Sequence, residues 1–341
     1  MQDTFPRIDI HAHYYPESYL GAVEAAGCDC GACVTRRAEG PVIDAGPLHA
    51  GPLEKRFIDL DLRIADMDRQ GIDVQALSLT QPMVYWADEA LARSLSAVFN
   101  DALVTAHEEF PDRLLGLAMI PAHHADAAIA ELERIKDAPG IVGVYMGTAI
   151  GDMDLSDESL LPVFERIEAL GLPVFLHPLK VLGMTDRLKP WFLANLLGNP
   201  FDTAVAAAHL ICGGVLDRFK SLDVVLPHAG GALPFLAGRL QHGWSVRPEF
   251  AHMEQGPKDY MRRFHYDTIS HSDSALDWLI KEVGVDRIMS GSDYCFDMGL
   301  EDPVGTVKTQ GLAAEDEKAL LGANAIRLLG LDPKTGVVPA K

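Results

Sequence analysis

The sequence is short of positive charge. It has 29 Lys and Arg residues against 49 Asp and Glu residues, which gives a formal net charge of −20 at pH 7. Because such a chain repels phosphate backbones and anionic lipid headgroups, we expect no nucleic-acid partner and no membrane partner. A small anionic substrate would have to be met by a local cluster of positive charge, such as a metal ion with a few arginines.

Long apolar runs are also missing. No stretch approaches the roughly 20 apolar residues that a membrane-spanning helix needs. The N-terminus, MQDTFP, has no basic region followed by an apolar segment, so it does not have the pattern of a secretory signal. We therefore expect a cytoplasmic protein.

Cysteine is scarce, with five residues in a chain of 341. This number is too small for a disulfide framework, and we expect reduced thiols. Cys28, Cys30 and Cys33 lie close together, at intervals that can suit a zinc site. A fourth ligand is missing nearby, so the spacing favours free thiols that pack a loop.

Eight short apolar runs alternate with longer helical patterns, which is typical of βα units around a parallel sheet. Most runs are almost continuously apolar, as expected of strands that are covered on both faces. The predicted strands are residues 7–13, 74–80, 114–121, 141–146, 173–177, 222–228, 264–269 and 287–293. Helices are predicted over residues 61–70, 88–109, 125–136, 158–170 and 202–218.

The fold that this pattern favours is an α/β (β/α)8 TIM barrel, with an open doubly wound sheet as the alternative. With 48% hydrophobic residues the chain can bury one large core, so we expect residues 1–341 to form a single barrel domain. Residues 27–60, rich in Gly, Pro and Cys, break the alternation. We interpret them as an insertion in the first βα loop, on the active-site side.

His11 and His13 end the first apolar run. In a strand, residues two apart point to the same face, so both imidazoles would project from the carboxyl end of the barrel. A single His at a strand end is commonly a hydrogen-bonded structural residue. Two on one face are costly unless something coordinates them, so the pair favours a metal site.

Three further polar residues, His177, His228 and Asp293, each end a later apolar run. Because barrel active sites lie at the carboxyl ends of the strands, these runs bring their last residues to one volume. Any one of them alone could be a cap or a turn residue. Imidazole nitrogens with one carboxylate suit zinc first, although manganese or iron would accept the same set.

The His-x-His of the first strand with His, His and Asp at the ends of later strands resembles the amidohydrolase superfamily. Within it, five segments are similar to the aminocarboxymuconate-semialdehyde decarboxylase family. They are RIDIHAHYYP (7–16), RIADMD (63–68), HP (177–178), HAGG with LAGR (228–231 and 236–239) and GSDY (291–294). Together they cover nearly the whole chain.

The resemblance implies that His11, His13, His177 and Asp293 bind one divalent ion, while His228 stays off the metal and, with Asp293, is catalytic. Residues 141–146 contain no Lys, whereas binuclear relatives carry a carboxylated Lys there, so one ion is expected. Zinc is our first choice and manganese the alternative.

The implied activity is nonoxidative decarboxylation of an unsaturated or aromatic carboxylate, a carbon–carbon lyase reaction. His228 and metal-bound water would transfer the protons. The same groups would also support a metal-dependent hydrolase or hydratase, so the metal site alone leaves the reaction open.

Candidate substrate-binding residues are Arg239, Arg56, His49 and Phe296. In the resembling decarboxylases an arginine just after the His-Gly-Gly segment reaches the neighbouring subunit, so Arg239 implies a homodimer; its alternative is an arginine on a helix surface. The family's second arginine has no aligned counterpart in residues 27–60, and Arg56, His49 and Lys55 are the candidates to replace it. Phe296 could wall a planar substrate, or simply pack the core.

Overall fold

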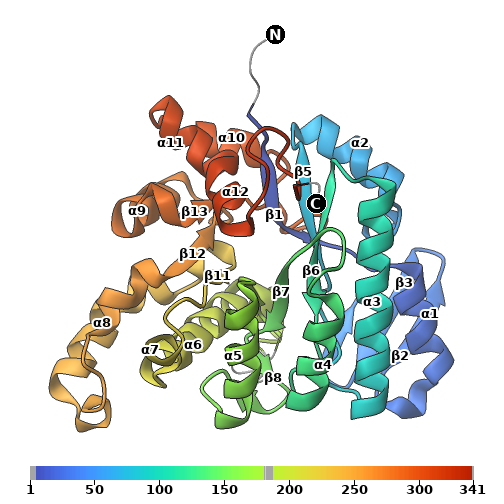
Figure 1. Cartoon of the computed structure of the whole chain (residues 1–341), viewed down its shortest axis with the longest axis horizontal. Helices are drawn as coiled ribbons and strands as arrows, with labels where there is room; N and C mark the ends of the chain where they lie inside the picture. Colours follow the sequence, from blue (N-terminus) through green and yellow to red (C-terminus); the bar gives the residue numbers. More distant parts are fainter. Residues whose placement is uncertain (1–4, 180, 182–186, 340–341) are drawn as a thin grey trace.

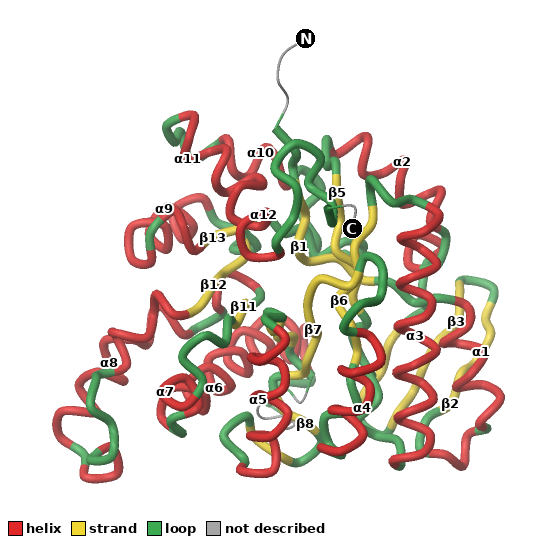
Figure 2. The backbone as a smooth tube through the Cα atoms, viewed as in Figure 1, coloured by secondary structure: helices red, strands yellow, loops and turns green. Residues whose placement is uncertain are grey.

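The computed structural model describes residues 5–179, 181 and 187–339. Eight parallel strands form one sheet in the order β1-β5-β6-β7-β10-β11-β12-β13, and helices lie outside the strands (Figures 1 and 2). The strands are β1 (Ile8–His13), β5 (Val74–Ser78), β6 (Leu114–Met119), β7 (Ile141–Gly147), β10 (Val174–His177), β11 (Val224–Leu226), β12 (Phe264–Asp267) and β13 (Ile288–Met289). Each lies within or overlaps one of the eight predicted runs.

The first and last strands close the sheet into a barrel. The backbone N–H of Ile10 donates to the carbonyl of Ser290 at 3.0 Å. Further along, Ala12 forms a parallel bridge with Tyr294. The prediction of a (β/α)8 barrel is therefore confirmed, and the open sheet is wrong.

The helices of the described chain follow the strands in turn. They are α1 (Glu17–Ala26), α2 (Leu60–Gln70), α3 (Glu89–Glu109), α4 (Ala125–Ile135), α5 (Leu161–Leu170), α6 (Asn199–Cys212), α7 (Val215–Arg218), α8 (Leu233–Val246), α9 (Asp273–Val283), α10 (Pro303–Lys308), α11 (Ala314–Lys318) and α12 (Asn324–Leu329). Local signals set some boundaries: Asp88 caps α3 by accepting from the backbone N–H of Leu91, and Gly71 ends α2 in the left-handed region.

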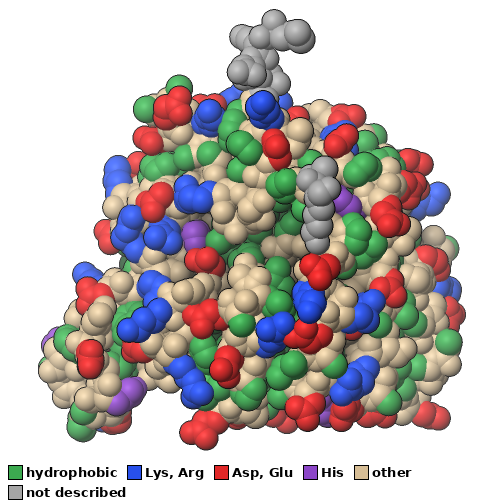
Figure 3. Space-filling view, in the orientation of Figure 1, with side chains coloured by type: hydrophobic (Ala, Val, Ile, Leu, Met, Phe, Trp, Pro, Cys, Tyr) green, Lys and Arg blue, Asp and Glu red, His purple; other side chains and the backbone are tan. Residues whose placement is uncertain are grey.

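The barrel strands are buried along their whole length, apart from the partly buried Ile141 at the start of β7, which explains their nearly continuous apolar sequence. All residues of β1, β5, β6, β10, β11 and β12 are buried. Within the described ranges, no helix combines the length and the apolar character needed to cross a lipid bilayer. On the face drawn in Figure 3, acidic and basic side chains are interspersed among apolar ones.

The segment between β1 and α2 contains α1 and a three-stranded antiparallel sheet, β2 (Cys33–Arg37), β3 (Gly40–Ala45) and β4 (Leu48–Ala50). This sheet lies within residues 27–60, and with α1 it lies beside α3 on one flank of the barrel (Figure 1). A two-residue turn joins β2 to β3, since Arg37 pairs with Gly40. A smaller hairpin, β8 (Ala149–Ile150) with β9 (Met153–Asp154), follows β7.

The expectation of free thiols in this segment is wrong for two of its three cysteines. Cys28 and Cys33 form a disulfide, whereas Cys30 remains a thiol. A short 3-10 turn over Cys28–Cys30 followed by Gly31 in the left-handed region reverses the chain, which brings the two Cα atoms to 4.4 Å. The number of cysteines in a chain indicates whether a disulfide framework is expected. It does not show whether a local turn brings two particular cysteines within bonding distance.

Candidate metal centre and substrate cavity

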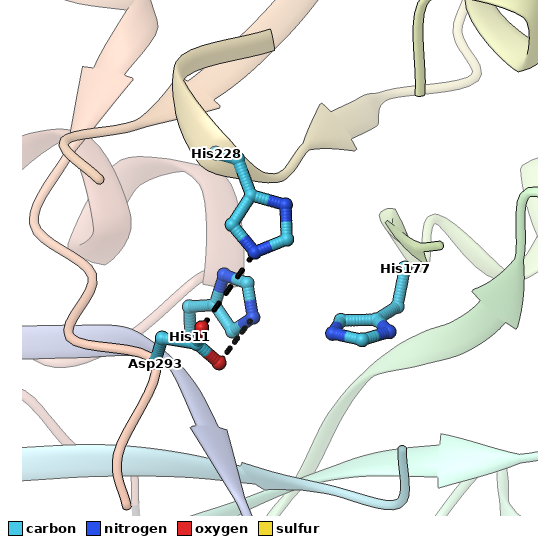
Figure 4. Close-up of side chains that lie close together, drawn as sticks. All are labelled: His11, His177, His228 and Asp293. Carbon is cyan, nitrogen blue, oxygen red and sulfur yellow. Dashed lines mark ion pairs between the residues drawn. The ribbon is translucent and has the colours of Figure 1, made fainter. Parts of the chain in front are cut away.

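Five side chains predicted from strand ends meet at the carboxyl end of the barrel. His11 and His13 lie on β1 and His177 ends β10, while His228 and Asp293 lie in the loops after β11 and β13. Figure 4 shows four of them pointing into one volume, with dashed lines that join Asp293 to His11 and to His228. One ligand atom from each of these four lies within 4.8 Å of all the others.

His13 belongs to the same cluster. Its Nε2 atom is 2.9 Å from Asp293 Oδ1 and 3.2 Å from His11 Nε2. The compact four-residue group includes His228 and leaves out His13, so it differs by one imidazole from the ligand set that the resemblance implies. The structure thus brings all five predicted residues together.

Hydrogen bonds fix which nitrogen of His11 faces the cluster. Asp267 Oδ2 lies 2.8 Å from His11 Nδ1 and accepts its proton, so the lone pair is left on Nε2. The same carboxylate accepts from the backbone N–H of His228 at 2.9 Å and of Ala229 at 2.8 Å. Asp267 therefore orients a candidate ligand and holds the loop that carries His228.

Asp267 has no role in the predicted site, although a signal was present. It lies near the end of the seventh predicted strand, in the same relative place as Asp293 in the eighth. A carboxylate at the carboxyl end of an apolar run could have been counted among the site residues.

His13 and His177 are oriented in the same sense as His11. Ser78 Oγ donates to the carbonyl of Ala12, and therefore accepts from His13 Nδ1 at 3.0 Å. His177 Nδ1 donates to the carbonyl of Pro178 at 2.9 Å. Three imidazoles thus keep Nε2 as the unprotonated nitrogen.

Burial and mutual proximity keep most of the cluster in the charge state that a metal ion needs. Burial lowers the pKa of His13 to about 4. Burial and the neighbouring imidazoles hold the pKa of His177 well below its usual value. For Asp293, burial acts in the other direction, but the neighbouring imidazoles of His13, His228 and His11 hold its pKa well below the usual range.

The pKa of His11 is raised instead. Burial lowers this pKa, but the hydrogen bond to Asp267 and the nearby carboxylates together raise it by more. At neutral pH the cluster therefore offers the neutral imidazoles of His13 and His177 beside the ionised carboxylate of Asp293, and a bound ion would displace a proton from His11 Nε2. This donor set fits a single divalent ion.

We expect Asp267→Asn to lower the affinity for the divalent ion by roughly 10–100-fold. The amide oxygen of the new asparagine can still accept from His11. Its NH2 group then faces the backbone N–H groups of Ala229 and Ile269, which are also donors. Competition against a metal chelator measures this affinity. Asp273→Asn, at the exposed start of α9, is the matched control, and an unchanged affinity in Asp267→Asn would contradict the orienting role.

A cavity of about 490 Å³ opens beside His228 and Asp293. This volume suits a small organic molecule. The apolar part of its lining consists of Leu196, Pro200, Ala229, Pro234, Phe235, Ile269, Ala275, Trp278, Leu279 and Met298. The polar part adds Asn195, Asn199, Ser270 and His271, of which the sequence analysis predicted none. A π-helical turn over Ala194–Gly198, the start of α6 and the loop after β12 supply them, and no periodic pattern marks such positions.

The four predicted substrate-binding residues do not line this cavity. The Phe296 ring lies 5.2 Å from that of His13, so it does pack against the cluster. Two of them lie beside carboxylates of the same chain. Arg56 Nε is 3.7 Å from Asp66 Oδ2, and His49 Nδ1 is 2.7 Å from Asp44 Oδ1. Arg239 is exposed on α8.

Comparisons with known proteins agree with this geometry. The family described as amidohydrolase matches residues 8–331. The chain is 32% identical to 2-amino-3-carboxymuconate-6-semialdehyde decarboxylase of Dictyostelium discoideum, over 96% of this chain and 92% of the relative. It is 29% identical to gamma-resorcylate decarboxylase of a Rhizobium species, over 82% and 90%.

A solved structure of 5-carboxyvanillate decarboxylase from Sphingomonas paucimobilis superposes with a TM-score of 0.83 at 26% identity. The match covers 96% of this chain and 100% of that one. The barrel fold is therefore shared with that decarboxylase over nearly the whole chain.

Proposed function

Because the chain belongs to the amidohydrolase family, in its branch of aminocarboxymuconate-semialdehyde decarboxylase-like proteins, we propose that it is a metal-dependent nonoxidative decarboxylase of an unsaturated or aromatic carboxylate. The observation that carries the proposal is the convergence of four imidazoles and one carboxylate beside a largely apolar cavity. The relatives act on muconate and aromatic carboxylates according to their names, which agrees with a cavity of this size.

His11, His13, His177 and Asp293 would hold the ion. The support for His13 over His228 is the anchoring of the Nδ1 atoms. His11, His13 and His177 each have a fixed acceptor there, whereas His228 Nδ1 has no partner among the described residues. The donor set favours zinc, with manganese as the alternative. When bound, such an ion acts as a Lewis acid that attracts and polarises the oxygens of the substrate.

His228 is placed to transfer a proton. Its side chain is 17% exposed and lines the cavity, and Nε2 lies 3.7 Å from Asp293 Oδ2. Its backbone lies at φ 53°, a strained conformation that Asp267 stabilises through the backbone N–H. These contacts aim one imidazole at the volume that a substrate would fill.

The reaction needs one proton in and one carbon dioxide out. His228 protonates the carboxylated carbon, the bond from that carbon to the carboxylate then breaks, and its electron pair returns to the π-system of the substrate. Carbon dioxide leaves, and His228 regains a proton from solvent. Neither an oxidant nor a reductant is consumed.

Isotope labelling tests the reaction. With 2,6-dihydroxybenzoate and 5-carboxyvanillate as first candidates, we expect carbon dioxide release and, in D2O, one deuterium at the vacated carbon. In water labelled with oxygen-18, the organic product is expected to stay unlabelled. Oxygen-18 in that product would instead identify the hydrolase or hydratase alternative.

A second copy of the chain is the partner that we propose for the surface around the cavity. Large apolar side chains are exposed there: Phe235 is 83% exposed, Phe201 48% and Leu196 43%. Exposed apolar clusters of this kind favour association. Phe235 shares α8 with Arg239, so a copy docked on this surface would bring Arg239 of each chain towards the cavity of the other.

Sedimentation velocity and kinetics together test this arrangement. We expect a dimer, which Phe235→Glu converts into a monomer because it places a charge in an apolar contact. Arg239→Ala is expected to keep the dimer and to reduce kcat/KM about 100-fold, as for a lost hydrogen-bonded charge. Arg93→Ala, exposed on α3, is the control; a monomeric native protein would contradict the proposal.

A further inference from the structure

The loop that carries Asp293 has a strained backbone. Asp293 lies at φ 60°, in the left-handed region that residues other than glycine seldom adopt. Such a conformation persists only where the surrounding contacts fix it. The N–H of Asp293 donates to the carbonyl of His11 at 2.8 Å. Further contacts hold the residues on either side of Asp293, and they come from one hydroxyl and one carboxylate.

Ser292 supplies the hydroxyl. The residue is fully buried, and its backbone N–H donates to Asp9 Oδ1 at 3.0 Å. Its hydroxyl donates to Asp9 Oδ2. The same hydroxyl oxygen accepts from the N–H of Tyr294 at 3.1 Å. One side chain therefore ties together the residues before and after Asp293.

Asp9 supplies the carboxylate and connects the loop to β1. It has no exposed surface, and its Oδ1 atom also accepts from the N–H of His11 at 3.0 Å. Its Oδ2 atom accepts from Gln75 Nε2 at 2.8 Å, and Gln75 Oε1 in turn accepts from Arg63. These partners of Asp9 are all donors, as a buried carboxylate requires. Asp9 therefore links the backbone of His11 to that of Ser292.

We propose that Asp9 and Ser292 are positioning residues of the metal centre, which hold Asp293 in its left-handed conformation and fix its carboxylate relative to His11. In the structure, His11 Nε2 lies 3.6 Å from Asp293 Oδ1. Both proposed residues lie outside the group of four that could hold the ion, so they act through Asp293. The inference rests on the proposed function in that it takes Asp293 as a ligand.

Ser292→Ala tests the proposal, because it removes one oxygen with little change in volume. The variant loses the hydroxyl contacts to Asp9 and Tyr294, while the backbone N–H at this position can still donate. We expect the affinity for zinc, measured by competition with a chelator, to fall roughly 10–100-fold, as for other groups that orient a ligand. In the cobalt-substituted protein the visible absorption bands are expected to shift, because they depend on the coordination geometry.

Ser290→Ala is the matched control. Ser290 is also fully buried, but its hydroxyl makes no hydrogen bond with any described residue. Zinc affinity and the cobalt spectrum are therefore expected to stay unchanged in this variant. Asp9→Asn places an NH2 group against other donors, so it is expected to weaken zinc binding at least as much as Ser292→Ala does. Urea denaturation of the metal-free proteins shows whether each variant is folded, and Ser292→Ala decides the test if Asp9→Asn is not.

An unchanged zinc affinity and cobalt spectrum in Ser292→Ala would overturn the proposal. An equal loss of affinity in Ser290→Ala would also overturn it, because the loss would then follow from removing any buried hydroxyl of this segment. A native protein that binds neither zinc nor manganese would contradict both the proposed function and this inference. A native protein that binds the ion but releases no carbon dioxide would contradict the proposed reaction alone, and the comparison of the two serine variants would still support the positioning role.

Discussion

His13→Ala is expected to reduce the affinity for the divalent ion by more than the roughly 10–100-fold that loss of an orienting partner costs. In the proposed ligand set, the loss of His13 would remove one bond to the ion, and it leaves Asp293 without its 2.9 Å neighbour. His228→Ala is expected to keep the ion and to lose turnover, since a general acid contributes typically 10²–10⁴-fold. Metal analysis after dialysis, combined with carbon dioxide release, measures both effects.

The comparison of these two variants separates the two possible ligand sets. Equal loss of metal in both would show that His228 also binds the ion, as the compact group of four permits. A His228→Ala variant that loses the ion while His13→Ala keeps it would reverse the two roles. His123→Ala is the control, because that ring donates to the carbonyl of Ala87 outside the cluster.

Arg63→Leu is expected to destabilise the protein by about 3–5 kcal/mol. This arginine on α2 has no exposed surface, and its guanidinium donates to Gln75 Oε1 at 2.7 Å and to the carbonyl of His13. It also lies over the ring of Tyr294, 4.7 Å from the centroid. The variant would leave these buried acceptors without a donor, and urea denaturation measures the resulting change.

Two further variants show whether the loss comes from the guanidinium fork. Arg63→Lys keeps the charge but cannot reach Gln75 and His13 together, so it is expected to be nearly as unstable. Arg69→Leu, on an exposed face of the same helix, is expected to change the midpoint little. If Arg63→Leu unfolds at the same urea concentration as the native protein, the buried network does not hold the end of β1.

The barrel and its cluster could be predicted from the sequence because both depend on local order. The eight apolar runs report burial on two faces, and a polar residue at the end of each run must lie at the barrel mouth. His11, His13, His177, His228 and Asp293 follow from that rule alone.

Residues whose roles depend on contacts across the fold could not be found in this way. Asp267 forms a hydrogen bond with His11, although 256 positions separate the two residues in the sequence. Arg56 and His49 are basic residues in a loop near the site, and only the folded chain shows that each lies beside a carboxylate, Asp66 or Asp44. A side chain's residue type does not reveal which neighbour neutralises it.

The anchoring of His11 and the His228 loop on one carboxylate has a mechanical consequence. Asp267 ends β12, so a small displacement of that strand would carry His11 and the loop of His228 in the same direction. The distance between His11 and His228 would then change little during small motions of the barrel. In the proposed reaction, this coupling would keep His228 aligned with the carboxylate of the substrate, where an error of about 1 Å can cost much of the rate.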